Sequence, residues 1–254
     1  MKCAFAFAVV LVLSMGTMAQ TAVPPGTVLP LRLSTSVDAR RVKPGQTVVA
    51  QIMQRVSLPS GSLARGTKVL GQVVRVSTGD RAPATLALRF DRLLSAGGVV
   101  PMQTSLRAIA SYMAVGEAEV PISGPDRGNA NPWDWTTEQI GGDIVYRGGG
   151  PVVDPGGNAV GKPVDDGVLD VVEAQPGSRC SRDVAANEPP QAFWVFSAGA
   201  CGVYGWYDIA IQHAGHSEPQ GEIVLASSKP DLKLPSGTGL LLRVVAPAGG
   251  EARR

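Results

Sequence analysis

Three stretches of this sequence share one pattern, a Pro/Gly turn followed by a run of β-branched and aliphatic residues. They are residues 25–33 (PGTVLPLRL), 66–73 (GTKVLGQV) and 235–244 (PSGTGLLLRV). A strand that is entered from a tight turn has this composition, because Gly and Pro set the turn and branched residues fit the pleated backbone. Since the pattern stands near both ends of the chain, we expect strands from both ends to join one β structure.

Further strand patterns follow at short, regular spacing. Residues 84–94 alternate most clearly, with Leu86, Leu88 and Phe90 on one face. The other face carries Thr85, Ala87, Arg89 and Asp91. A period of two is typical of a half-buried antiparallel strand. No window shows sustained helical periodicity with capping residues. The sequence therefore predicts an all-β fold, an antiparallel barrel or sandwich. Other strands are expected within residues 47–56, 67–76, 99–109, 191–196, 203–211, 222–225 and 239–245.

The composition changes in the middle of the sequence. From about residue 114 to 218, Gly, Pro, Asp and Asn become dense, and the four tryptophans (133, 135, 194 and 206) all lie there. Loops on a β scaffold tolerate long additions and often carry function. We expect a β-barrel module formed by residues 23–113 plus 219–246, a long Gly/Trp-rich irregular β insertion at 114–218, and a flexible tail at 247–254.

The N-terminus predicts export. A positive start at Lys2 precedes an apolar run over residues 3–13 and small residues up to Ala19. This order is typical of a secretory signal peptide, and the run is shorter than the roughly 20 residues that span a bilayer. We expect residues 1–19 to be removed, with cleavage after Ala22 as an alternative and an uncleaved anchor as another. The expected location is periplasmic or secreted, in a bacterial envelope, with no transmembrane helix in the mature chain.

Two cysteines, Cys180 and Cys201, remain after the signal peptide. In an oxidising compartment an isolated pair is most simply a disulfide, and it would fasten the insertion. Two free thiols are the alternative. The net charge of +2, with arginines scattered along the chain, does not predict a nucleic-acid partner.

The order of the strand patterns resembles a known family. It runs P-G-T-x-L-x-L, G-Q-T-V-V-A-Q-I, L-P-x-G-S/T-x-V-x-G-x-V, an alternating strand ending in R-F-D-R-L, and D-L-x-L-P-x-G-T-x-L-x-x-R-V. This resembles the C-terminal β-barrel of the TrbI family, a component of the outer-membrane complex of conjugation-type type IV secretion systems. The resemblance covers residues 23–107 and 221–245 and implies a barrel. The family's apolar pore-lining hairpin is replaced here by a polar insertion, so a role as the secretion channel is not expected.

Catalytic and metal-binding patterns are incomplete in this sequence. His213 and His216 form an H-x-x-H pair near Asp208 and Glu218, but lack the spacing of a catalytic zinc helix. No G-x-S-x-G occurs around a serine, and Ser62, Ser197 and Ser236 all lie in turn-like text. The glycine clusters lack the Lys and Ser/Thr of a phosphate loop. We therefore predict no metal, no cofactor and no catalytic residue.

One insertion segment carries a ligand-binding pattern. Trp133 and Trp135 flank Asp134, and aromatic rings beside a carboxylate are typical of sugar-binding surfaces, although such rings also fill the thin cores of small β domains. Paired carboxylates could hydrolyse a glycoside. The same aspartates could bind Ca²⁺ through oxygen ligands, but the D-x-[DN]-x-[DN]-G order of a calcium loop is not present. The other acidic residues available for this are Glu138, Asp143, Asp165, Asp166 and Asp170.

These observations predict an exported, non-enzymatic envelope protein, a β scaffold that contacts another protein or a cell-wall polysaccharide. The alternative is a secreted carbohydrate-binding protein or glycoside hydrolase that uses the insertion carboxylates and tryptophans. A pair of buried tryptophans would argue against this alternative, and a cleft with two facing carboxylates would favour it.

Overall fold

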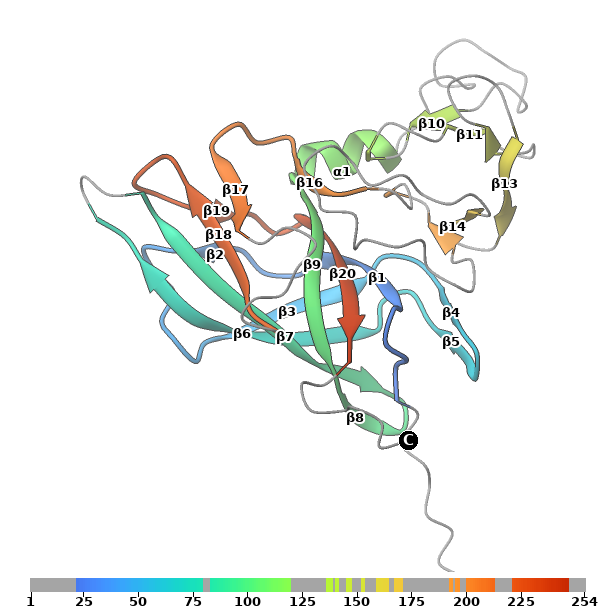
Figure 1. The fold of residues 1–254 in the computed structure, drawn as a ribbon, viewed down its shortest axis with the longest axis horizontal. Coiled ribbons are helices and arrows are strands. Elements are labelled where there is room, and N and C mark those ends of the chain that lie inside the picture. The colour runs from blue at the N-terminus through green and yellow to red at the C-terminus, as the bar shows by residue number, and fades with distance from the viewer. Residues whose placement is uncertain are drawn as a thin grey trace, which may run out of the picture.

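The computed structural model describes twelve segments of the chain, and strands predominate in them (Figure 1). The single helix among them is α1 (Tyr112–Glu119), so the expectation of a mostly β protein is confirmed. The predicted signal peptide and C-terminal tail lie outside the described residues. The segments are residues 22–79, 83–119, 136–138, 140–141, 145–147, 152–153, 159–164, 167–170, 192–193, 195–196, 200–212 and 221–246.

Ten strands form one large sheet. Their order across it is β16-β9-β20-β1-β3-β6-β7-β18-β17, and β8 pairs with β7 outside this path. The bounds are β1 (Val28–Leu33), β3 (Thr47–Ile52), β6 (Lys68–Ser77), β7 (Thr85–Ser95), β8 (Gly98–Pro101), β9 (Gln103–Ala110), β16 (Gly202–Tyr204), β17 (Ile209–Gln212), β18 (Ile223–Ser227) and β20 (Gly239–Val245).

The two ends of the described chain meet in this sheet. Strand β1 pairs with β20 in antiparallel register, with Leu31 opposite Leu240. Each strand is entered from a turn that contains a glycine with positive φ, Gly26 (φ 90°) and Gly237 (φ 91°), a conformation that residues with a Cβ seldom adopt. The expectation that the repeated turn-and-strand pattern brings both ends into one β structure is confirmed.

The predicted antiparallel barrel is wrong in two respects. The sheet is mixed, because β16 runs parallel to β9, and it does not close into a barrel. It curls far enough for β9 to touch β7, where the Met102 N–H donates to the Asp91 carbonyl (2.9 Å) and Thr104 Oγ1 donates to the Phe90 carbonyl (2.8 Å). Beyond this point β9 pairs with β20 and β18 pairs with β7. The gap between β9 and β7, which we call the open seam, is therefore not closed by a strand ladder.

The main core lies inside the curl of the sheet. It combines inward side chains from every strand between β9 and β18, including Leu31, Leu88, Phe90 and Leu242, all at most 1% exposed. Leu86, Leu88 and Phe90 are buried together, as the alternation in residues 84–94 predicts. On the other face Thr85, Arg89 and Asp91 are only partly buried, but Ala87 is buried at 3% exposure. The burial of these apolar faces is the dominant favourable term in folding.

Helix α1 covers part of the outer face of the sheet, and the sequence analysis did not predict it. The helix begins after Ser111, whose Oγ accepts a hydrogen bond from the Ala114 N–H (3.1 Å) as an N-cap does. Val115 and Ala118 pack with Phe196 and Leu241 in a second apolar cluster on this face. Because the helix has only eight residues and two inward side chains, its sequence carries little helical periodicity.

The region predicted as an insertion contributes to two sheets. Strands β16 and β17 fall within residues 114–218 and belong to the large sheet. Six other strands of this region form a separate sheet, drawn beyond α1 in Figure 1. They are β10 (Thr136–Glu138), β11 (Val145–Arg147), β12 (Val152–Val153), β13 (Ala159–Val164), β14 (Gly167–Asp170) and β15 (Ala192–Phe193). Two small ladders complete the fold, β2 (Val37–Asp38) with β19 (Lys233–Leu234), and β4 (Val56–Leu58) with β5 (Gly61–Leu63).

Candidate ligand-binding pocket

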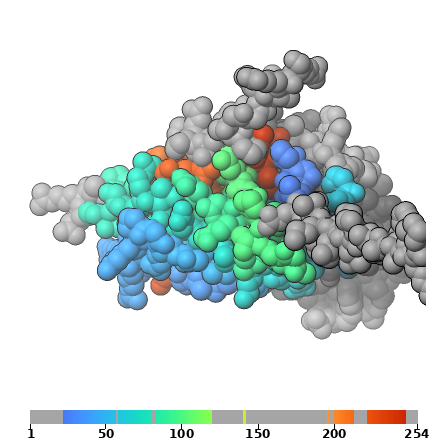
Figure 2. All heavy atoms as spheres, turned by 90° about the horizontal axis from the view of Figure 1, so that it is seen from below, coloured from blue at the N-terminus to red at the C-terminus, as the bar shows by residue number. Residues whose placement is uncertain are grey.

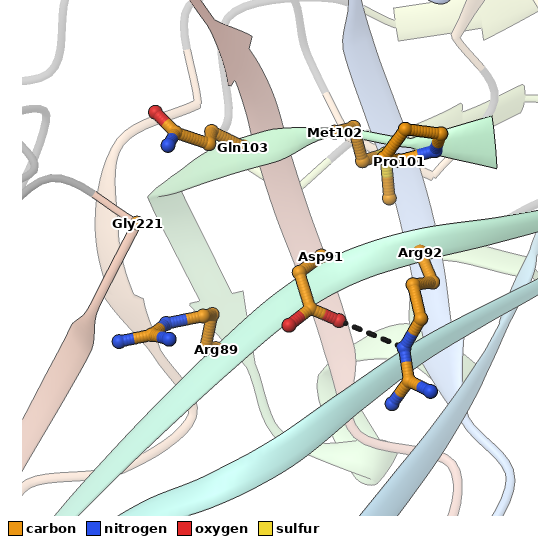
Figure 3. Close-up of a pocket in the computed structure, with 7 residues that line it drawn as sticks. All are labelled: Arg89, Asp91, Arg92, Pro101, Met102, Gln103 and Gly221. Atoms are coloured by element: carbon orange, nitrogen blue, oxygen red, sulfur yellow. Dashed lines mark hydrogen bonds and ion pairs between the residues drawn. The ribbon is translucent and has the colours of Figure 1, made fainter. Parts of the chain in front are cut away.

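A pocket lined by both charged and apolar groups lies in the fork where β9 and β18 leave the same edge of β7 (Figure 3). Its volume is about 670 Å³, which is within the range of small-molecule sites. We call it the fork pocket. The described residues that line it are Arg89, Asp91, Arg92, Pro101, Met102, Gln103 and Gly221. In the space-filling view, residues of the first half of the chain, coloured blue to green, cover the left and centre of the face that is shown (Figure 2).

The local backbone of β7 explains why charged side chains reach the pocket. Leu88 and Phe90 point into the core, so Arg89 between them points outward. The register with β6 places Gly71 opposite Phe90 and Leu70 opposite Arg92, so Asp91 is the extra residue of a β-bulge. A bulge re-aims side chains and is common beside functional sites. It brings Asp91 and Arg92 to the same side of the pocket.

Gly71 on β6 is required by this arrangement. A Cβ at this position would lie 2.4 Å from the Arg89 carbonyl oxygen and 2.7 Å from the Phe90 ring. Such distances are shorter than real Cβ contacts, so only glycine lets the Phe90 ring lie against the neighbouring strand. The backbone position of Arg89, a pocket residue, therefore depends on Gly71, which lies outside the pocket.

Of the two arginines among the described lining residues, Arg92 is paired with a carboxylate and Arg89 is open to an anionic ligand. Arg92 Nε donates to Asp91 Oδ1 at 3.0 Å, with the two side chains 43% and 28% exposed. Arg89 makes no ion pair with a carboxylate in the described part of the chain. In Figure 3 its guanidinium extends away from Asp91, on the side of Gly221. The described side chains thus carry one net positive charge, and a guanidinium open to an anion.

Apolar and amide groups complete the described lining. Met102 is 9% exposed, and Pro101 beside it is exposed on the rim. Gln103 Oε1 is buried without a hydrogen-bond partner in the structure. No histidine, cysteine or hydroxyl side chain occurs among the described lining residues. The arrangement offers ionic and hydrogen-bonding contacts to a ligand.

A second buried cation, Arg107, lies on β9 but does not line the pocket. It is 1% exposed and is the extra residue of another bulge, since Ala108 faces Leu241 and Leu106 faces Leu242. Burial, and then the positive charge of Arg243, lower the pKa of Arg107 to about 10, while Tyr204 acts in the opposite direction. Strand β9, which carries Arg107, lies between β16 and β20 in the sheet. Because the side chain is buried there, a structural role is favoured over ligand binding.

The residues predicted for ligand binding and for the disulfide are mostly not described. Trp133, Asp134, Trp135 and Cys180 lie outside the described residues, so the tryptophan site and the disulfide remain predictions. Cys201 is buried at 4% exposure, and its backbone N–H and carbonyl both bond to the Tyr204 hydroxyl (3.0 Å each). Among the candidate carboxylates, Glu138 lies on β10 and Asp170 on β14.

The other sequence candidates are placed only in part. His213, His216, Glu218 and Ser197 lie outside the described residues, and Asp208 pairs with Lys229 Nζ at 3.4 Å. Ser236 Oγ donates to backbone carbonyls of residues 33 and 34, which is a turn contact. The described residues contain no group of three or more His, Cys, Asp and Glu side chains that could hold a metal. Nor do they include a helix long and apolar enough to cross a membrane.

Sequence reasoning placed Arg89 and Asp91 on the outer face of a strand but did not identify the pocket. The signal available was the text R-F-D-R, in which three charged residues surround one core aromatic. The fork itself depends on which strands pair with β7, and that is long-range information.

No family model matches this chain, and no curated protein matches it significantly.

Proposed function

We propose that this protein is an exported, non-enzymatic envelope protein whose β scaffold binds another envelope component at the fork pocket. The observation that carries the proposal is the Arg89 guanidinium, which pairs with no carboxylate among the described residues and lies beside the Asp91–Arg92 pair in a pocket of about 670 Å³. Unpaired charged groups in a concave, partly apolar site are typical of ligand recognition. The cysteine pair and the N-terminal sequence support an oxidising location outside the cytoplasm.

The proposal includes a distant relationship to the TrbI-like β-barrel. Its support is that residues 23–107 and 221–245, which carry the resemblance, supply most strands of a single curled sheet. A scaffold of this kind, with its charged pocket on the outside of the sheet, fits an accessory role in the envelope better than a pore, because the middle region is polar.

Export and binding are tested together by fractionation and co-sedimentation. We expect the full chain, expressed in a bacterium, to be recovered from the periplasm or medium with its N-terminus shortened. The purified mature protein should then pellet with envelope material that contains membranes and cell wall. Arg89→Gln should reduce the pelleted fraction, because it removes the charge and keeps a polar side chain of similar reach.

The matched control is Arg40→Gln, since Arg40 is an exposed arginine that does not line the pocket. It should pellet like the parent protein. Recovery of an unshortened chain in the cytoplasm would contradict export. Equal pelleting of the two variants would contradict binding through the pocket.

A further inference from the structure

We propose that the fork pocket recognises the free carboxyl end of a peptide, with the carboxylate on Arg89 and the adjacent N–H on Asp91. This inference rests on the proposed function, because it takes the fork pocket as the binding site and names the chemistry of its ligand. It assigns separate contacts to two side chains on the same strand.

The first contact follows from the state of Arg89 compared with other arginines of the sheet. Arg32, Arg75 and Arg92 each pair with a carboxylate, whereas Arg89 has no such partner in the described part of the chain. A guanidinium presents two parallel N–H groups that match a carboxylate. The described lining also carries one net positive charge, which favours an anion.

The second contact follows from Asp91. Its Oδ1 accepts the hydrogen bond of Arg92 Nε, which orients the carboxylate, and its Oδ2 has no hydrogen-bond partner among the described residues. An ionised carboxylate only accepts hydrogen bonds, so a ligand that uses Oδ2 must bring a donor. Figure 3 shows Asp91 between the two arginines, with the Arg89 guanidinium extended to the side of Gly221, so a ligand held by Arg89 has to reach back along the pocket to bring its donor to this acceptor.

A ligand must therefore bring an anionic group for Arg89 and a hydrogen-bond donor for Asp91, and these two requirements distinguish between classes of anion. A phosphate dianion brings three acceptor oxygens and would be repelled by Asp91, whereas a carboxylate monoanion matches the net charge of the described lining. A peptide carries an N–H one bond from the carbon that bears its terminal carboxylate. Met102 and Pro101 form an apolar part of the wall that suits the side chain of the last residue. The carboxyl end of a peptide therefore contacts Arg89, Asp91 and the apolar wall, whereas a simple carboxylic acid contacts only Arg89.

Isothermal titration of the purified mature protein tests this inference with defined peptides. The probes are tri-alanine with a free carboxylate, the same peptide with an amidated C-terminus, and a version that ends in D-alanine, as wall peptide stems do. We expect amidation to weaken binding about tenfold or more, because it removes a charge-assisted pair. Arg89→Gln should weaken binding of the free acid by a similar factor.

The losses of affinity caused by peptide amidation and by Arg89→Gln should not be additive. On the Arg89→Gln variant, amidation should make no further difference, since both remove the same pair. Asp91→Asn should weaken binding of the amide, because it removes the charged acceptor of the ligand N–H. It should weaken the acid less, because it also removes a negative charge beside the ligand carboxylate. Arg40→Gln should leave both affinities unchanged. Tighter binding of the D-alanine peptide identifies a wall stem as the source, and tighter binding of the L-peptide identifies a protein C-terminus.

Several results would overturn the inference. Equal affinity of the parent protein for the acid and the amide excludes recognition of the carboxylate, and this comparison needs no variant. Equal loss of both peptides on Arg89→Gln excludes a direct pair. If neither peptide binds while the protein still pellets with envelope material in an Arg89-dependent way, the ligand assignment fails and the proposed function stands. If that pelleting is also absent, both fail.

Discussion

Phe90→Ala is expected to lower the free energy of unfolding by about 3–5 kcal/mol, the usual cost of truncating a buried phenylalanine. Phe90 is fully buried in the main core, and its carbonyl also accepts the Thr104 hydroxyl that ties β9 to β7. The loss combines the transfer free energy of the ring with the cavity that it leaves. Urea unfolding of the mature protein, followed by tryptophan fluorescence, measures it.

The matched control is Tyr207→Ala, which truncates an aromatic side chain that is fully exposed (106%). It should change the unfolding free energy by no more than about 0.5 kcal/mol. A Phe90→Ala variant as stable as this control would show that the curl of the sheet does not enclose Phe90.

Gly71→Val is expected to lower the free energy of unfolding by about 3 kcal/mol, because it overpacks a site with no free space. The added Cβ would lie 2.4 Å from the Arg89 carbonyl oxygen, and a backbone atom cannot move aside as a flexible side chain can. Since the displaced backbone carries Arg89, the variant should also lose affinity for the pocket ligand under conditions where it remains folded.

The control for Gly71→Val is Gly97→Ala, whose new Cβ would meet only Ser95 Oγ at 3.8 Å. It should leave both stability and ligand affinity unchanged. In the Phe90→Ala background, Gly71→Val should cost less than in the parent protein, because the ring that it would strike is gone. Strict additivity of the two substitutions would contradict the predicted contact.

Most of the β structure could be predicted from local sequence. The alternation of residues 84–94 identified β7 and its buried face, and the repeated turn pattern indicated that β1 and β20 belong together. These features depend on period and turn chemistry, which neighbouring residues determine. The eight-residue helix α1 escaped because its burial depends on Phe196 and Leu241, which are remote in sequence.

The pocket and the open seam could not be predicted in the same way. Both depend on the pairing of β9 with β20 instead of with β7. The pocket also depends on the bulge at Asp91, which turns its side chain outward. Register and bulges are set by pairing between distant strands, and a single sequence gives no measure of that pairing. Arg89 was correctly placed on the outer face, but the absence of a carboxylate partner within the described part of the chain appears only when the carboxylates there are positioned.

Site-specific photo-crosslinking in living cells tests most directly whether the fork pocket binds an envelope component. A photoreactive amino acid replaces Pro101, an exposed residue that lines the pocket, and a second strain carries it at Arg40 as the control. We expect a discrete adduct from position 101 that is absent from position 40 and is lost when Arg89→Gln is added. Adducts of equal yield from both positions, or no adduct from position 101, would contradict it.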